Sequence, residues 1–217
     1  MKETLSILLK YLTQHKNIHQ NTKGGKIIFM ERQTFIDDKS FTNLEIGAGC
    51  GNFGKIFHSK CYLTDCDLEL KKICDECHID WFCDAHDLTW KNDRFDTVIM
   101  CNPYRYGFNT IDDTERLMWE LLRVLKRNKS KIIMVCRHDN KYCNPYKVNK
   151  MINTFLEKYE SFYSEPYATL SLTVESTPID SKIDYEGYVF KRMDGGQTFP
   201  NYKITIHVEQ YIKYELN

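Results

Sequence analysis

The sequence has no long apolar run and no excess of charge of either sign. Its 217 residues include 30 Lys and Arg and 30 Asp and Glu, so the formal net charge is +0. This balance counts against a protein that binds nucleic acid through a general basic field. No segment approaches the roughly 18 consecutive apolar residues that a membrane-spanning helix needs. We therefore expect neither a transmembrane helix nor bulk nucleic-acid binding.

The sequence also lacks internal repeats and low-complexity segments. Its length is enough for one sizeable hydrophobic core. Residues 1–6 contain an acidic residue and lead into a periodic segment, unlike a secretion signal. We expect one cytoplasmic domain, with residues 1–42 as a covering segment, residues 43–160 as an α/β core and residues 161–217 as a β-rich segment.

Cysteine, in contrast, is abundant, with nine residues. Their odd number and their positions in predicted strands and helices indicate reduced thiols. Cys74, Cys77 and His78 fit a c-type haem attachment sequence, which we reject because it would require export and a different fold. A zinc site from Cys74, Cys77, Cys83 and His86 is conceivable. We disfavour it because cysteines on an apolar helix face or in a strand behave as small hydrophobes.

Strands and helices alternate from residue 43 onward. Apolar runs predict strands at residues 44–46, 61–64, 79–83, 95–101 and 131–136. Helical periodicity predicts helices that begin near residue 52 and that span residues 68–77, 114–127 and 146–159. This alternation is typical of a parallel sheet with helices on both faces.

The N-terminal segment is predicted to be an amphipathic helix followed by a loop. Residues 3–16 place Leu5, Leu8, Leu9 and Leu12 on one helical face. This helix either covers the edge of the sheet or forms a lid over a pocket, and we favour the cover. Residues 17–42 are predicted to be mostly loop, with a short element at 27–30.

The C-terminal segment is rich in β-forming residues and has no helical period. Residues 187–193 and 203–209 are predicted to form an antiparallel hairpin around Asp194-Gly195-Gly196. Residues 162–174 are predicted to add a strand, or a loop that covers a pocket.

Four of the ten glycines lie within residues 43–54, directly after the first predicted strand. A glycine turn there lets backbone N–H groups approach a ligand closely. Gly47, Asp65, Asp84 and Asn102 follow consecutive predicted strands, at separations of 18, 19 and 18 residues. The carboxyl ends of parallel strands meet at one edge, where open α/β sheets bind ligands. We therefore expect these four residues to converge on one site.

Residues 43–136 resemble the nucleotide-binding half of class I S-adenosylmethionine-dependent methyltransferases. The LEIGAGCG sequence at 44–51 is similar to the first motif of that family, an acidic residue followed by GxGxG. Residues 95–99 resemble its fourth strand, and residues 121–135 resemble the following helix and fifth strand. One departure is RNKS at 127–130, where the family usually has a Pro-Gly-Gly turn. The resemblance implies a Rossmann-like three-layer sandwich, with a mostly parallel seven-stranded sheet and a C-terminal antiparallel hairpin.

The resemblance also implies S-adenosyl-L-methionine as the cofactor. By resemblance, Glu45 orders the glycine turn, which passes close to the methionine part of the cofactor. Asp65 would accept hydrogen bonds from the ribose hydroxyls, and Asp84 would accept one from the adenine amine. The residues assigned to the cofactor in this way are Glu45, Gly47, Ala48, Gly49, Gly51, Asp65, Cys66, Asp84, Ala85 and Asn102.

The Asn102-Pro103-Tyr104 sequence is similar to the Asn-Pro-Pro-Tyr motif of enzymes that methylate exocyclic amines or amide nitrogens, although one proline is missing. By this resemblance, the Asn102 oxygen and a following backbone carbonyl accept the hydrogens of the amine and direct its lone pair at the methyl group. Tyr104 would then stack on a planar acceptor. A simple Pro-fixed turn is the alternative.

Further residues near this motif are candidates for the acceptor site. Residues 105–108 would extend its wall, and Arg105 either holds an anionic group of the substrate or is solvated. His138, after the fifth strand, is a possible general base. We thus predict Asn102, Tyr104 and His138 as catalytic, and Pro103, Tyr104 and Arg105 as substrate-binding.

Other functions remain open from the sequence. The GCGNFG sequence at 49–54 fits the G-x-G-x-x-G pattern of nicotinamide dinucleotide-binding proteins. However, Gly47 already closes the strand, and a dinucleotide site does not explain Asp84 or Asn102. An oxygen or carbon acceptor on a small metabolite, and a catalytically silent scaffold, are further alternatives. The identity of the methyl acceptor is not predicted.

Overall fold

The computed structural model describes residues 40–51, 53–54, 61–73, 77–104, 106–162, 168–191 and 197–212. The predicted helix at 3–16 and the element at 27–30 lie outside these residues. The same is true of Arg105 and Cys74.

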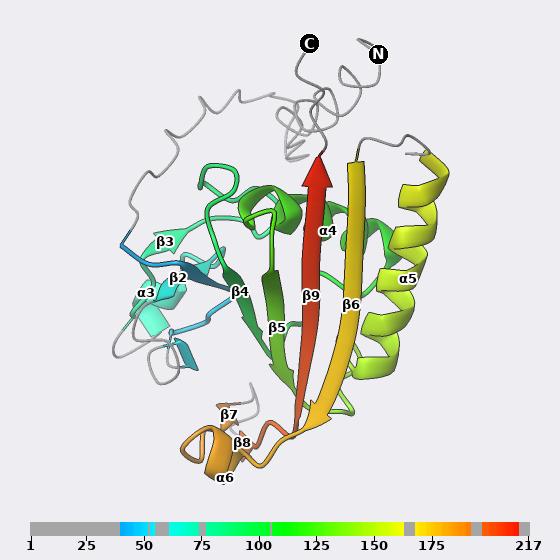
Figure 1. Ribbon diagram of the computed structural model, residues 1–217. Coiled ribbons are helices and arrows are strands. Elements are labelled where there is room, and N and C mark those ends of the chain that lie inside the picture. Colours follow the sequence, from blue (N-terminus) through cyan, green and yellow to red (C-terminus); the bar gives the residue numbers. More distant parts are fainter. Residues whose placement is uncertain are drawn as a thin grey trace, which may run out of the picture. The chain divides into compact units, whose positions relative to one another are not determined.

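The main sheet has seven strands in the order β3-β2-β1-β4-β5-β9-β6 (Figure 1). The first five are parallel to one another, whereas β9 runs antiparallel to both β5 and β6. This arrangement confirms the predicted α/β fold with a mostly parallel sheet and a C-terminal antiparallel pair. The strands are β1 (Asn43–Ile46), β2 (Cys61–Asp65), β3 (Trp81–Phe82), β4 (Thr97–Cys101), β5 (Ser130–Cys136), β6 (Ala168–Pro178) and β9 (Tyr202–Ile212).

The pairing of the last strand differs from the predicted hairpin. β9 pairs with β6 along its whole length, from Ala168 opposite Ile212 to Pro178 opposite Tyr202. Between them lie the short helix α6 (Ser181–Asp184) and a separate two-stranded sheet of β7 (Phe190–Lys191) and β8 (Gln197–Thr198). The predicted pairing of residues 187–193 with residues 203–209 is therefore wrong.

The physical reason is that β6 is a longer strand than residues 187–193 could form, so it pairs with more of β9. Leu170, Leu172 and Val174 pack with the hydrophobic core that also contains Ile206 of β9. The predicted partner segment, in contrast, begins at Gly187, which has a φ of 75° and cannot continue an extended strand.

Helices α4 (Ile111–Val124) and α5 (Pro145–Phe162) pack against each other, and α5 runs alongside β6 (Figure 1). The Trp119 ring of α4 lies 5.3 Å from the Phe155 ring of α5. α4 begins three residues before the predicted start, because Thr110 caps it by accepting a hydrogen bond from the Asp113 N–H. A further short helix, α3 (Leu70–Ile73), follows β2.

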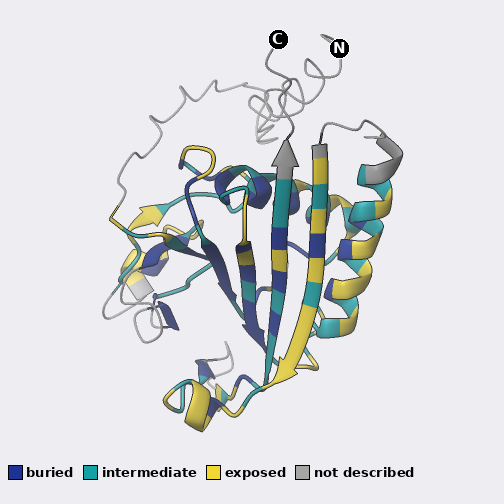
Figure 2. Ribbon diagram, viewed as in Figure 1, coloured by how far each residue is buried: buried dark blue, intermediate teal, exposed yellow. Residues whose placement is uncertain are grey.

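The strands alternate between two hydrophobic clusters, one on each face of the sheet. Leu44, Val98 and Ile132 belong to the larger cluster, which includes the buried side chains of α4 and α5. Ile99 and Val135 belong to the smaller cluster on the opposite face. Buried residues accordingly dominate β1, β4 and β5, whereas exposed residues are frequent on β6 (Figure 2).

One cysteine departs from the prediction of nine reduced thiols. Cys50, in the glycine turn, is disulfide-bonded, and its partner lies outside the described residues. The prediction is wrong at this position because an odd number of cysteines requires only that one thiol stay unpaired. The free cysteines of the described part of the chain are Cys61, Cys66, Cys77, Cys83, Cys101, Cys136 and Cys143.

Two further predictions concern membrane spans and metal sites. No helix among them is long and apolar enough to cross a membrane. They contain no group of three or more His, Cys, Asp or Glu side chains arranged for a metal ion. Cys74, one of the four residues of the zinc alternative, lies outside these residues.

Candidate functional site

A glycine turn follows β1 at the carboxyl edge of the sheet. Gly47, Gly49 and Gly51 have φ values of 64°, 60° and 83°, in the left-handed region that other residues rarely adopt. The turn is held by hydrogen bonds from the Ala48 N–H to the Thr64 carbonyl (2.9 Å) and from the Gly51 N–H to the Ala48 carbonyl (2.9 Å). A Cβ atom built on Gly49 would meet nothing within 4 Å, so this side of the turn faces open space.

Asp65, the last residue of β2, is bound directly to this turn. Its Oδ2 accepts a hydrogen bond from the Gly49 N–H at 2.8 Å, and its Oδ1 accepts one from the Asp67 N–H at 2.9 Å. Partial burial and then the nearby carboxylates of Asp65 and Asp84 raise the pKa of the Cys66 thiol. The structure therefore brings the glycine turn, Asp65 and Asp84 together, which are three of the four strand ends that we expected to converge.

Asp84 closes the turn that follows β3. Its Oδ1 accepts a hydrogen bond from the His86 N–H at 2.8 Å and lies 2.9 Å from His86 Nδ1. The Asp84 side chain remains 43% exposed, whereas the adjacent Ala85 packs against the larger hydrophobic cluster. Asp84 thus presents a carboxylate at the edge of the sheet beside an apolar residue.

Glu45 is a buried carboxylate directly below the glycine turn. The residue is fully buried, and neither carboxylate oxygen accepts a hydrogen bond of normal geometry. Burial is the main cause that raises the pKa of Glu45 to about 8, and the charge of Asp65 adds to it. The backbone N–H of Gly54 is close enough to offset part of this rise.

Gly54 is a packing glycine of the helix that follows the turn. A Cβ atom at this position would lie 2.1 Å from Glu45 Oε2 and 2.3 Å from Leu63 Cδ2. Only a residue without a side chain allows the helix to approach β1 and β2 this closely. The left-handed glycines of the turn are therefore Gly47, Gly49 and Gly51, and Gly54 is not one of them.

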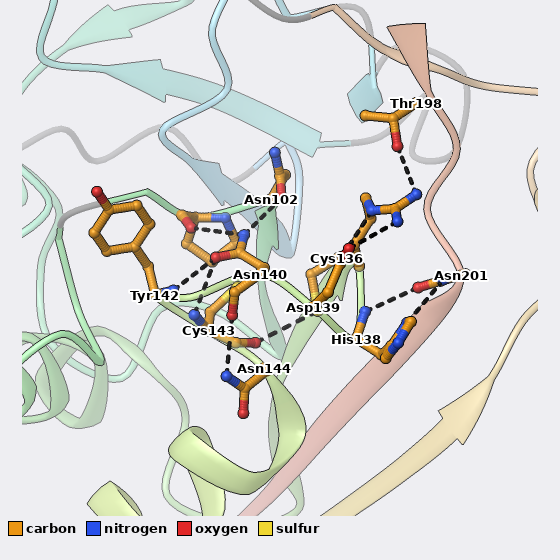
Figure 3. A network of polar contacts seen from close by, with 12 residues as sticks. Asn102, Cys136, His138, Asp139, Asn140, Tyr142, Cys143, Asn144, Thr198 and Asn201 are labelled. Carbon is orange, nitrogen blue, oxygen red and sulfur yellow. Dashed lines mark hydrogen bonds and ion pairs between the residues drawn. The ribbon is translucent and has the colours of Figure 1, made fainter.

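Asn102 follows β4 and has a φ of 47°, a left-handed conformation that asparagine tolerates better than most residues. Its backbone N–H donates to the Val135 carbonyl at 2.7 Å. Its side-chain Oδ1 accepts a hydrogen bond from Asn140 Nδ2 at 2.7 Å, and the same nitrogen donates to the Pro103 carbonyl at 3.3 Å (Figure 3). Both oxygens that the sequence assigned to an amine acceptor thus contact one nitrogen of the protein.

Asn140 lies in the loop between β5 and α5, which is rich in side-chain to backbone hydrogen bonds (Figure 3). Its Oδ1 accepts from the Tyr142 N–H at 2.8 Å and the Cys143 N–H at 3.3 Å. Asn144 Nδ2 donates to the Asn140 carbonyl at 3.1 Å, while Asn144 Oδ1 accepts from the Lys147 N–H in the first turn of α5. The loop is therefore anchored independently of the contact with Asn102.

Tyr104 and His138 do not contact Asn102 or Asn140 through any hydrogen bond described for the structure. The Tyr104 side chain is 54% exposed, and its ring lies 4.5 Å from the Tyr142 ring. His138 is exposed, and its ring faces the Asn201 side chain with a 3.1 Å contact between Asn201 Nδ2 and His138 Nδ1 (Figure 3). The catalytic roles of both residues remain predictions.

Two tyrosines, Tyr106 and Tyr188, lie near the glycine turn and Glu45, and only Tyr106 belongs to a segment that we expected near the site. The Tyr106 hydroxyl donates to the Ile46 carbonyl at 3.0 Å and would lie 2.1 Å from a Cβ atom on Gly47. Burial, followed by the charges of Asp65 and Glu45, raises the pKa of Tyr106 well above its ordinary value. Tyr106 thus covers the start of the glycine turn, in a segment expected only to form a wall.

Tyr188 belongs to the segment after α6 and packs its ring 5.1 Å from that of Phe53. Burial and then the neighbouring Cys101 and Glu45 raise the pKa of Tyr188. Figure 1 shows that α6, β7 and β8 lie beyond the carboxyl ends of β4 and β5. The segment that approaches this edge is therefore the β6–β9 connection, and no local sequence pattern indicates it.

Neither a protein-family model nor a curated protein matches the chain. Among solved structures, it is similar to a possible histamine N-methyltransferase, described as S-adenosylmethionine-dependent, from Thermotoga maritima. The identity is 12% over 96% of this chain and 95% of that one, with a TM-score of 0.45. It is also similar to S-adenosylmethionine-dependent methyltransferases from Archaeoglobus fulgidus (13% identity, 78% and 87% covered, TM-score 0.44) and Methanosarcina mazei (12% identity, 82% and 95% covered, TM-score 0.41). At these identities and TM-scores the similarities carry no argument about function.

Proposed function

We propose that this chain is an S-adenosylmethionine-dependent methyltransferase that transfers the methyl group to a nitrogen atom. The main supporting observation is the pair formed by Asp65 and the glycine turn. A carboxylate at the end of β2 and a left-handed turn after β1 are joined by the hydrogen bond from the Gly49 N–H to Asp65. This pair offers acceptors for ribose hydroxyls next to a turn that a ligand can approach closely.

The residues around this pair fit the remaining parts of the cofactor. Glu45 lies buried directly before the glycine turn, and its proposed role is to order that turn. Asp84 and Ala85 offer a carboxylate and an apolar contact for an adenine ring. Ala48, Cys66 and Asn102 complete the proposed cofactor set.

When bound, S-adenosylmethionine would supply a sulfonium methyl group. The nitrogen lone pair would form the N–CH3 bond while the electron pair of the broken C–S bond stays on sulfur. One N–H proton would then leave to water. The task of the protein is to position that nitrogen. Asn102 Oδ1 and the Pro103 carbonyl are the proposed acceptors for its hydrogens, because both oxygens reach a single nitrogen at hydrogen-bond distance. Tyr104 and Arg105 are proposed as substrate-binding, and His138 as a possible base.

A nicotinamide dinucleotide is less well supported by the same observations. The dinucleotide fold has the parallel strand order 3-2-1-4-5-6, whereas here the antiparallel β9 lies between β5 and β6. In the dinucleotide register Gly49 would close the strand, but β1 ends at Ile46 and Gly47 is already left-handed.

Calorimetric titration with S-adenosylhomocysteine and, separately, with NADH tests the cofactor. We expect micromolar affinity for S-adenosylhomocysteine and no heat of binding for NADH at the same concentrations. Tight binding of NADH without binding of S-adenosylhomocysteine would overturn the proposal.

A further inference from the structure

His86 holds the carboxylate of Asp84 through two contacts. Its backbone N–H donates to Asp84 Oδ1 at 2.8 Å, and its ring Nδ1 lies 2.9 Å from the same oxygen. We infer that His86 is a positioning residue, which fixes the Asp84 carboxylate so that the proposed cofactor site selects a nucleoside whose base carries an amino group. This inference rests on the proposed function, in which Asp84 and Ala85 receive the adenine ring.

The backbone on either side of Asp84 is fixed by hydrogen bonds. The Cys83 N–H donates to the Asp65 carbonyl at 2.9 Å, which joins this segment to the end of β2. The Asp87 N–H donates to the Asp84 carbonyl at 3.0 Å and closes the turn. The Asp84 side chain is 43% exposed, so its torsions are set by polar contacts such as those of His86 and not by burial.

The surroundings of the His86 ring favour a neutral donor. The side chain is 12% exposed, and Nε2 is buried without a hydrogen-bond partner among the described residues. A hydrogen on Nδ1 gives Asp84 a hydrogen bond, whereas a hydrogen on Nε2 would leave a buried N–H group without an acceptor. The neutral ring with its hydrogen on Nδ1 thus fixes the carboxylate without cancelling its negative charge.

A fixed carboxylate distinguishes an amino group from a carbonyl oxygen on the base. A carboxylate has several lone-pair sites, so Asp84 can accept from His86 and from an amine of the base together. A carbonyl oxygen at the same place offers no hydrogen, and its lone pairs would oppose those of the carboxylate. A carboxylate held by His86 cannot turn away from this repulsion, whereas an unrestrained one can turn towards water. Loss of the His86 ring should therefore reduce the selectivity of the site.

The test compares the dissociation constants of S-adenosylhomocysteine and of S-inosylhomocysteine, which has a carbonyl oxygen in place of the amine, by calorimetry on the full chain. We expect the unmodified chain to prefer the adenosyl compound at least about 100-fold. His86→Ala keeps the backbone N–H but removes the ring, and this preference should fall about tenfold. His86→Asn restores a side-chain N–H donor close to the backbone, as Nδ1 is, and should recover most of the preference.

His207→Ala is the matched control, because His207 also contacts a carboxylate, with its Nε2 3.3 Å from Glu175 Oε2, but pairs with Lys131 near the start of β5. It should leave both dissociation constants unchanged. An undiminished preference in the folded His86→Ala variant, even if both compounds bind more weakly, would overturn the inference. Equal affinity of the unmodified chain for the two compounds would overturn it as well. Binding of neither compound would instead overturn the proposed function.

A second measurement needs no variant. The nitrogen NMR signals of the imidazole rings in the unmodified chain show which ring nitrogen carries the hydrogen, and comparison with His86→Asn assigns those of His86. We expect the hydrogen on Nδ1, as the contact with Asp84 requires. A neutral His86 ring with its hydrogen on Nε2 would overturn the inference, because Nδ1 could not then donate to the carboxylate.

Discussion

The two halves of the carboxyl edge of the sheet present their polar groups differently. The half that we propose for the cofactor, called the cofactor half below, consists of the glycine turn, Asp65 and Asp84. Left-handed glycines fix its backbone conformation, and a Cβ atom on Gly49 would meet nothing within 4 Å. The half that we propose for the acceptor, called the acceptor half below, consists of Asn102, Pro103 and Tyr104. Side chains of the β5–α5 loop contact it. The first half is thus held mainly by hydrogen bonds of the backbone, and the second mainly by contacts between side chains.

The two halves differ because a backbone turn forms the first, whereas contacts between side chains hold the second. A backbone turn in the left-handed region has few alternative conformations, so it remains in the shape that receives a ligand. A side-chain contact such as that of Asn140 with Asn102 can exchange for an equivalent contact with a ligand at little net cost. We therefore expect substitutions in the two halves to affect different measurements.

The largest expected effect is on turnover, from loss of the Asn102 side chain. Asn102→Gly preserves the left-handed backbone at this position, where φ is 47°, and removes the side-chain oxygen. We expect methyl transfer to an amine or amide acceptor to fall at least about 100-fold, because the nitrogen loses one of its two positioning contacts. Affinity for S-adenosylhomocysteine, measured by calorimetry, should change little.

Asn102→Asp provides the rescue for this experiment, since it restores an oxygen that can accept from an N–H group. Most of the lost turnover should return in this variant. If Asn102→Gly retains full activity, the acceptor half has been assigned to the wrong residues, although the cofactor half would be unaffected.

Local patterns predicted which residues lie together at the carboxyl edge, because each of them follows a strand at regular spacing. Gly47, Asp65 and Asp84 could be placed at one edge as soon as the parallel sheet was recognised. The division of the chain into a covering segment (1–42), an α/β core (43–160) and a β-rich segment (161–217) stays a prediction. The fold was also predicted, apart from the partner of β9.

The acceptor half depends on contacts between distant segments, which leave no local signature. Asn140 is 38 residues from Asn102, and an asparagine in the loop before a helix is common for reasons of capping alone. Tyr188 comes from the β6–β9 connection, which is also distant in sequence, so its position near the site could not be predicted from a local pattern. The pairing of β9 with β6 was missed because a long connection separates the two strands, and a nearer segment offered a plausible turn.

A second prediction concerns how the free energy of unfolding depends on pH, and it tests only Glu45, which lies next to the cofactor half. Burial raises the pKa of Glu45 to about 8, from 4.5 as its ordinary value. Between these values the folded chain keeps a proton that the unfolded chain has lost, so the free energy of unfolding should fall as pH rises. The contribution of Glu45 is at most about 1.4 kcal/mol per pH unit, and it levels off above pH 8.

Glu45→Gln should remove this part of the slope, as measured by urea unfolding at several pH values across that interval. Asn102→Gly should leave the slope as it is in the unmodified chain. An identical slope in the Glu45 variant and the unmodified chain would mean that Glu45 is ionised in the folded protein, and it would remove the buried neutral carboxyl from the description of the cofactor half.

The smallest expected effect is on cofactor affinity, from Asp65→Ala. This change removes the proposed acceptor for the ribose hydroxyls and the hydrogen bond that ties Gly49 to β2. We expect S-adenosylhomocysteine to bind at least about tenfold more weakly, since hydrogen bonds to a charged group are among the stronger ones. Calorimetric titration of the folded variant measures this effect.

Asp80→Ala is the control, because Asp80 also accepts a backbone hydrogen bond from β2, from the Leu63 N–H at 2.8 Å. Leu63 lies before the end of the strand, so this substitution should lower stability and leave the cofactor affinity unchanged. Equal losses of affinity in the two variants would show that any damage to β2 weakens binding. The cofactor half would then owe its affinity to the rigidity of the strand, and not to the carboxylate that ends it.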